Sequence, residues 1–136
     1  MKSAQTGINF REVRPLNGDQ REGFEELSVS LFRSQYGKLV HRVNGAGGDG
    51  GVEAYARHPD LGLVGLQAKY FIDTLTDRQF RQIKKSIKSA MTNHPELKLY
   101  IVTVPQDLTP TRDEQWNELV GETEKEYPEL TLEWWG

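Results

Sequence analysis

The chain has 136 residues, of which 36% are hydrophobic and 27% charged, a length and balance that suit one folded domain. It contains no cysteine, which excludes disulfides, thiolate nucleophiles and cysteine-ligated zinc. No apolar run approaches the roughly 20 residues of a membrane-spanning helix, and the start, MKSAQTGINF, lacks the apolar core of a signal peptide. We therefore expect one domain over residues 1–136, located in the cytoplasm.

Charge is distributed unevenly along the chain. The net charge is −3, but residues 1–104 carry 15 Lys and Arg against 11 Asp and Glu, whereas residues 105–136 carry 2 against 9. A polyanion responds to the local field of a surface and not to the sum over the chain. The acidic total therefore does not exclude binding to nucleic acid.

The N-terminal half predicts one helix followed by three strands. Apolar residues at helical spacing follow Asp19, a capping residue, and end at Gly37. The run NGAGGDGG holds five glycines in eight residues and predicts a tight loop between two strands, and HPDLG predicts a turn before the third strand. The three predicted strands span residues 38–43, 52–57 and 63–71.

The C-terminal half predicts two further helix–strand pairs. Thr76 with Gln79 forms a capping pattern for a helix that stops at His94, and residues 97–104 are a β-branched run typical of a strand buried on both faces. A third helix is expected to start near Thr111, and a short strand over residues 130–134. The order is α-β-β-β-α-β-α-β. The final tryptophans either pack back on the domain or are covered by a following segment of a longer protein.

Three polar side chains are predicted to meet on the second and third strands. If their turn is symmetric about Asp60, Glu53 lies opposite Gln67, with Lys69 two residues further on the same face. Val52, Ala54, Leu66 and Ala68 then take the other face. The alternative is an exposed hairpin face with ordinary polar residues.

Asp49 lies in the glycine run, four residues before Glu53. Two carboxylates with an amide oxygen form an oxygen-only donor set, which suits Mg²⁺ or Mn²⁺. The alternative for Asp49 is a hydrogen bond to its own backbone, as is common in turns.

The second helix carries a cationic stripe. Its positively charged residues follow helical spacing: Arg78, Arg81, Lys85 and Lys88, with Lys84 beside them. Such a stripe is either a solvated face or a surface that follows a phosphate backbone.

Three motifs together carry a resemblance. Phe24-Glu25-x-Leu27 on the first helix, GGDGGVEA before a strand and Gln67-Ala68-Lys69 closing the next strand resemble the Mrr-like branch of the PD-(D/E)xK nucleases, which uses Q-x-K. The resemblance covers about residues 20–104. It implies an α/β fold with a restriction-endonuclease-like αβββαβ core, in which helices flank a mixed central sheet.

The resemblance also implies roles for individual residues. Glu53 would be the metal-binding acid, Gln67 the second ligand, Lys69 the catalytic lysine and Glu25 the acid of the first helix. The family usually has Asp where this chain has Glu53, so Asp49 stays a second candidate for the main metal ligand. The implied cofactor is Mg²⁺ or Mn²⁺.

The function implied is that of an endonuclease that hydrolyses double-stranded DNA with little sequence specificity. Such domains serve in bacterial restriction or anti-phage defence, which predicts a C-terminal sensor or NTPase region and at least transient dimers for cutting both strands. The alternatives are an inactive DNA-binding module of the same fold, a regulatory domain that binds nucleotide or phosphate through the glycine loop, and an interaction domain that displays Trp134 and Trp135.

Overall fold

The computed structural model describes residues 20–37, 40–42 and 51–136, with backbone alone for 40–42. Within these residues the chain forms three helices and five strands in the predicted order α-β-β-β-α-β-α-β. The elements are α1 (Gln20–Tyr36), β1 (Val40–Arg42), β2 (Ala54–His58), β3 (Gly62–Ala68), α2 (Asp77–Asn93), β4 (Leu97–Thr103), α3 (Pro110–Glu126) and β5 (Thr131–Trp135).

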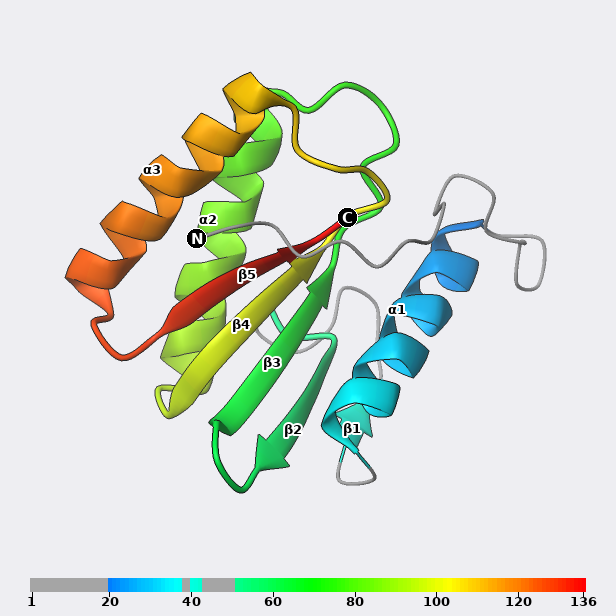
Figure 1. Cartoon of the computed structure of the whole chain (residues 1–136), viewed down its shortest axis with the longest axis vertical. Coiled ribbons are helices and arrows are strands. Elements are labelled where there is room, and N and C mark those ends of the chain that lie inside the picture. The colour runs from blue at the N-terminus through cyan, green and yellow to red at the C-terminus, as the bar shows by residue number, and fades with distance from the viewer. Residues whose placement is uncertain (1–19, 38–39, 43–50) are drawn as a thin grey trace.

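The described strands form one mixed sheet with the order β1-β2-β3-β4-β5. The pairs β1–β2 and β2–β3 are antiparallel, whereas β3–β4 and β4–β5 are parallel. Parallel neighbours need a crossover, and α2 and α3 provide the two crossovers. Figure 1 shows α1 on one face of the sheet and α2 with α3 on the other. The predicted α/β class with a mixed sheet between helices is thus confirmed.

The two crossover helices begin with different caps. Thr76 precedes α2 as predicted, and its backbone N–H donates to Oε1 of Gln79 at 2.7 Å. The predicted start of α3 near Thr111 is confirmed, since the helix begins at Pro110. Thr109 is the cap, because Pro110 fits the first helical turn and the Thr109 hydroxyl accepts the backbone N–H of Arg112 at 3.3 Å.

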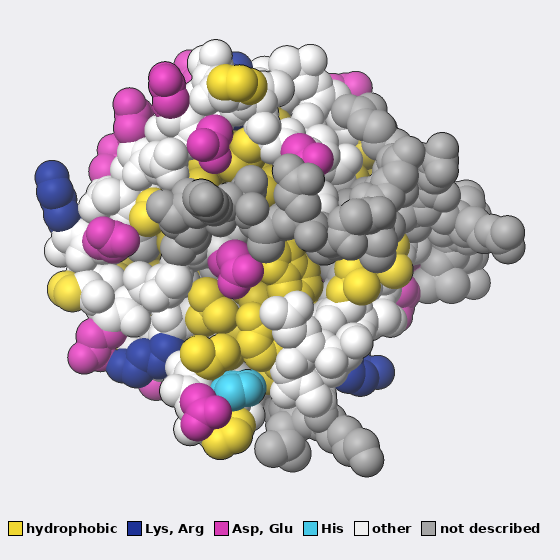
Figure 2. Space-filling model, viewed as in Figure 1, with side chains coloured by type: hydrophobic (Ala, Val, Ile, Leu, Met, Phe, Trp, Pro, Cys, Tyr) yellow, Lys and Arg dark blue, Asp and Glu magenta, His cyan; other side chains and the backbone are white. Residues whose placement is uncertain are grey.

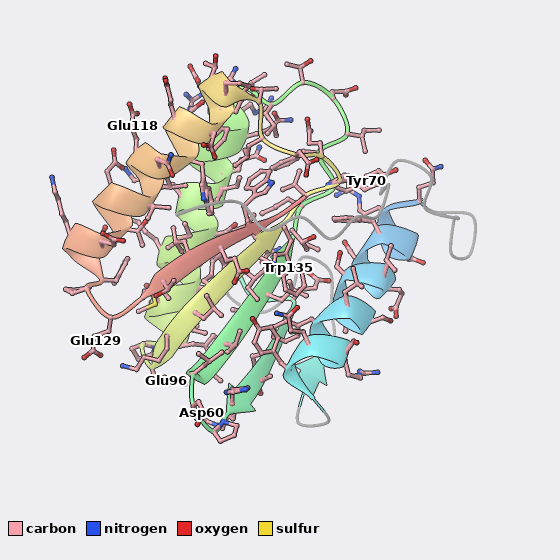
Figure 3. The ribbon with its side chains drawn as sticks, in the orientation of Figure 1. Asp60, Tyr70, Glu96, Glu118, Glu129 and Trp135 are labelled. Atoms are coloured by element: carbon pink, nitrogen blue, oxygen red, sulfur yellow. The ribbon has the colours of Figure 1, made fainter. Side chains whose placement is uncertain are left out.

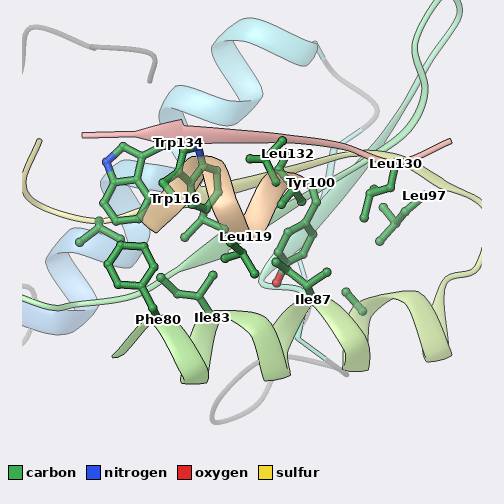
Figure 4. Close-up of a cluster of buried hydrophobic side chains, with 14 of the residues drawn as sticks. Phe80, Ile83, Ile87, Leu97, Tyr100, Trp116, Leu119, Leu130, Leu132 and Trp134 are labelled. Atoms are coloured by element: carbon green, nitrogen blue, oxygen red, sulfur yellow. The ribbon is translucent and has the colours of Figure 1, made fainter. Parts of the chain in front are cut away.

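The larger hydrophobic cluster lies between the sheet and the two crossover helices. It joins Phe80 and Ile83 of α2 to Trp116 of α3 and to Trp134 of β5 (Figure 4). The Trp134 ring lies 6.4 Å from Phe80 and 5.4 Å from Trp116, measured between centroids. Trp134 and Trp135 are 0% and 3% exposed, so both pack back on the domain. Among the described residues, no helix has the length and apolarity that a membrane span requires.

Acidic residues gather on α3. In the view of Figure 2, Asp and Glu side chains line the outer side of the molecule where Figure 1 draws this helix, and Figure 3 labels Glu118 among them. The acidic C-terminal quarter of the sequence thus lies beside α2, the helix with the predicted cationic stripe.

Candidate functional site

The hairpin strands pair as predicted from the turn as far as Ala54, the residue after Glu53. The β2–β3 pairs run from Ala54 opposite Leu66 to His58 opposite Gly62, symmetric about Asp60. The predicted pairing of Glu53 with Gln67 is wrong, since the backbone N–H of Glu53 donates to the carbonyl oxygen of Leu66 at 2.7 Å. Leu66 therefore faces two consecutive residues, which is the pattern of a β-bulge.

The bulge corrects the predicted position of Val52. Strict alternation would put Val52 beside Ala54 on the α1 face, but Val52 is fully buried in the cluster against α2 and Ala54 in the cluster against α1. One extra residue reverses the alternation at this point. Glu53, at the bulge, is 6% exposed.

Gln67 and Lys69 lie at the end of β3 and face α2. The backbone N–H of Lys69 donates to the carbonyl oxygen of Thr103 at 2.9 Å, so β4 still holds the chain just beyond the strand. Together with α2 they enclose a hollow of about 240 Å³, lined by Gly51, Gln67, Lys69, Gln82, Lys85, Ser86 and Ser89.

Gln67 is buried with one polar atom unsatisfied. Its side chain is 4% exposed, and Nε2 donates to the carbonyl oxygen of Ala68 at 3.1 Å. Oε1 is buried and has no hydrogen-bond partner among the described residues. A buried acceptor without a donor costs about 1–3 kcal/mol, so Gln67 lowers the stability of the folded state.

Charge links Glu53, Lys69 and Tyr100. Burial lowers the pKa of Lys69, and the negative charge of Glu53 acts in the opposite direction. Burial, followed by the charge of Glu53, raises the pKa of Tyr100. The charge of the Glu53 carboxylate therefore acts on both the Lys69 ammonium group and the Tyr100 phenol.

Gly51 fixes the chain that leads to Glu53. Its φ is +82°, and an added Cβ would collide with the backbone carbonyl oxygen of Ser86 and lie 3.2 Å from the backbone nitrogen of Ala90. Its own carbonyl oxygen accepts the Tyr100 hydroxyl at 2.5 Å. Glycine is required here by both the conformation and the contact with α2. Asp49, two residues earlier, lies outside the described residues.

Glu25 stands apart from this hollow. The N-terminal half of α1 packs on the opposite face of the sheet, where the Phe24 ring lies 5.7 Å from that of Tyr70. Glu25 is half-buried and has interactions of its own, but it is not among the residues that line the hollow.

The cations of α2 do not form the single face that we predicted. Lys84 forms an ion pair with Glu122 of α3, with Nζ 2.8 Å from Oε2. Arg81 and Lys84 line a groove of about 280 Å³ whose other wall includes Glu118 and Glu122. The acidic helix α3 packs beside α2 and takes up this flank. Lys85 instead lines the hollow, whereas Arg78 and Lys88 are exposed.

The oxygen donors at the site are compatible with a hard divalent cation. Within residues 20–37 and 51–136 there is no group of three His, Cys, Asp or Glu residues that could hold a metal. The oxygen-bearing side chains buried at this site are Glu53 and Gln67, and Oε1 of Gln67 has no hydrogen-bond partner among the described residues. Carboxylate and amide oxygens are ligands that Mg²⁺ accepts when water completes its coordination.

The sequence interpretation missed the contribution of α2 to the hollow. Gln82, Lys85, Ser86 and Ser89 follow the spacing i, i+3, i+4, i+7, which places them on one flank of a helix. This helical spacing can be read from the sequence, but the interpretation of α2 considered only its basic residues.

No family model, curated protein or solved structure matches this chain. The functional interpretation therefore depends on the motifs and the geometry.

Proposed function

We propose that this protein is an Mg²⁺- or Mn²⁺-dependent endonuclease that hydrolyses phosphodiester bonds of double-stranded DNA. The observation that carries the proposal is the buried, unsatisfied Gln67 beside Lys69 in a hollow with a second lysine, Lys85, together with the charge of the buried Glu53 that acts on Lys69. Buried polar groups of this kind cost stability, and such costs concentrate at functional sites. The order αβββαβ of the first six elements agrees with a restriction-endonuclease-like core.

Each residue has a role in this proposal. Glu53 and the Oε1 atom of Gln67 would hold the metal ion, and Asp49 is a further candidate ligand. When bound, the ion polarises the scissile phosphate and offsets charge on the leaving oxygen. Lys69 orients the attacking water or accepts its proton, or holds a positive charge beside the phosphate. Gln67 is neutral, so metal binding is weaker than at a site with two carboxylates.

Exposed cations of α2 meet the DNA backbone. Arg78 and Lys88 are free to follow phosphates, whereas Lys84 is engaged by Glu122. Backbone contacts position a duplex without reading its sequence, which agrees with cleavage at many sequences. We further propose that the domain acts in bacterial restriction or anti-phage defence under a C-terminal sensor or NTPase region, and that two copies cut the two strands.

The test is cleavage of supercoiled plasmid with and without Mg²⁺ and Mn²⁺. We expect Lys69→Ala to lose cleavage by about 10²–10⁴-fold while its circular dichroism spectrum is unchanged. Lys98→Ala is the matched control, because Lys98 lies at the other end of β4 and pairs with Glu129. Figure 3 shows Tyr70, next to Lys69, and Glu129 at opposite ends of the sheet. An active Lys69→Ala protein would refute the role of this lysine.

Metal binding separates the two candidate acids. In calorimetry, Glu53→Gln should abolish Mn²⁺ binding, whereas Asp49→Asn should only weaken it. The reverse order would move the main ligand to Asp49.

The second candidate is an inactive DNA-binding module of the same fold. It is favoured by the single carboxylate, that of Glu53, that the described residues bring to the site. Wild-type protein that binds duplex DNA but cleaves it with neither cation would support this module.

A further inference from the structure

The hollow beside Lys69 has the chemistry of an anion site. Its described lining residues supply two ammonium groups, two hydroxyls, two amides and the backbone of Gly51, and none of them is acidic. Every one of these side chains offers a hydrogen-bond donor. A lining of donors with two positive charges suits an oxyanion.

The donors come from two elements that the fold holds together. Lys69 extends from the end of β3, and Lys85, Ser86 and Ser89 lie on the flank of α2 that faces it. Gly51 fixes the distance between the two, because its backbone lies directly against Ser86 and Ala90. The arrangement is therefore built into the packing of α2 on the sheet and does not require a loop to close.

Electrostatics favours an anion in this hollow. Two lysines line the hollow, and an anion bound there would be attracted by both. Glu53 compensates part of the charge of Lys69, but it is not among the residues that line the hollow. Lys85 has an exposed side chain and can adjust to a ligand.

We propose that this hollow binds a phosphate group directly, without a metal ion, through Lys69, Lys85, Ser86 and Ser89. The identification of that phosphate with the DNA backbone rests on the function proposed above. The site then has two parts: Glu53 and Gln67 for the metal ion, and the donors of α2 with Lys69 for the phosphate. Lys85 is a positioning residue of this subsite and is distinct from the cations that α3 engages.

The experiment measures phosphate binding by the full chain in EDTA. Inorganic phosphate is titrated at constant ionic strength and thermal unfolding is recorded, since a ligand that binds the folded state raises the unfolding temperature. A fluorescein-labelled duplex, followed by anisotropy in the same buffer, is the second probe. The variants are Lys85→Gln and Ser89→Ala, and Lys98→Gln is the control.

We expect phosphate to stabilise the wild type and Lys98→Gln equally. Lys85→Gln should weaken phosphate and duplex binding by about tenfold or more, as the loss of one charge-assisted hydrogen bond predicts. Ser89→Ala should weaken phosphate binding by a smaller factor. A response to the duplex without a response to phosphate would mean that DNA binds outside the hollow, which overturns the proposal.

Two further outcomes distinguish this inference from the proposed function. Phosphate binding in EDTA by a protein that cleaves with neither Mg²⁺ nor Mn²⁺ would support the subsite and refute the nuclease. Metal-dependent cleavage by a Lys85→Gln protein with unchanged phosphate and duplex affinity would support the nuclease and refute the subsite.

Discussion

Gln67 provides a prediction about stability that tests the site without turnover. Replacement by methionine keeps the length and approximate volume of the side chain but removes both polar atoms. The substitution removes the buried, unpartnered Oε1, whose burial destabilises the wild type by about 1–3 kcal/mol. It also removes the hydrogen bond from Nε2 to the carbonyl oxygen of Ala68, which stabilises by about 0.5–1.5 kcal/mol. The balance predicts that Gln67→Met is more stable than wild type by about 1 kcal/mol.

For a chain of 136 residues this difference corresponds to a rise in Tm of about 3–5 °C. The sign is informative, since most substitutions at buried positions destabilise. Thermal unfolding in EDTA, followed by circular dichroism, measures it directly.

Gln106→Met is the matched control. The Nε2 atom of Gln106 donates to the carbonyl oxygens of Phe71 and Asp73 at 2.7 and 2.8 Å. The same substitution there removes two satisfied hydrogen bonds and should destabilise by about 1–3 kcal/mol. If Gln67→Met lowered Tm as Gln106→Met does, Oε1 of Gln67 would have a partner in the folded protein, and the argument that it awaits a ligand would fail.

Two further predictions concern the framework of the site. Gly51→Ala should destabilise the fold by about 2–5 kcal/mol, because the residue has a positive φ and the added Cβ would collide with α2. Gly121→Ala on α3, where an added Cβ meets open space, should stabilise the fold by about 0.5–1 kcal/mol. Urea unfolding measures the free energy of unfolding of both variants. Burial raises the pKa of Tyr36 to about 12 and also raises that of Tyr100. Both phenols then stabilise the fold below about pH 10, the ordinary tyrosine value, and this contribution is lost as the pH rises through the folded pKa. Absorbance at 295 nm counts ionised tyrosines, so at pH 11 the Tyr36→Phe and Tyr100→Phe variants should absorb as the wild type does until unfolding; a lower absorbance in either variant would contradict the assigned burial.

The sequence predicted the fold well where one local force dominates. The β-branched run 97–104 is unambiguous because a strand with helices on both faces needs apolar residues on each side, and β4 spans Leu97–Thr103. The hairpin register followed from the turn alone as far as Ala54, because turn geometry sets the pairing until a bulge interrupts it. Thr76 and Gln79 marked the start of α2 through a hydrogen bond between neighbours in the chain.

The sequence failed where tertiary contacts decide. The bulge at Glu53 adds one residue to one strand, and no alternation of side chains reveals it in advance. The division of the α2 cations depends on α3, whose position beside α2 follows from the parallel crossover of β4 and β5.

That division has a measurable consequence for DNA binding. Each phosphate contact contributes about 0.9 to the slope of log K against log salt. A lysine already paired with a carboxylate contributes less, because removing the lysine charge leaves that carboxylate unpaired beside the DNA. Lys84→Gln should therefore change the slope by well under 0.9, since Glu122 lies 2.8 Å from its Nζ. Lys88→Gln, an exposed neighbour on the same helix, should reduce the slope by about 0.9. Anisotropy of a labelled duplex over a series of salt concentrations gives both values. Equal reductions for the two variants would mean that the pair between Lys84 and Glu122 opens when DNA binds, and α3 would then compete with the nucleic acid for α2.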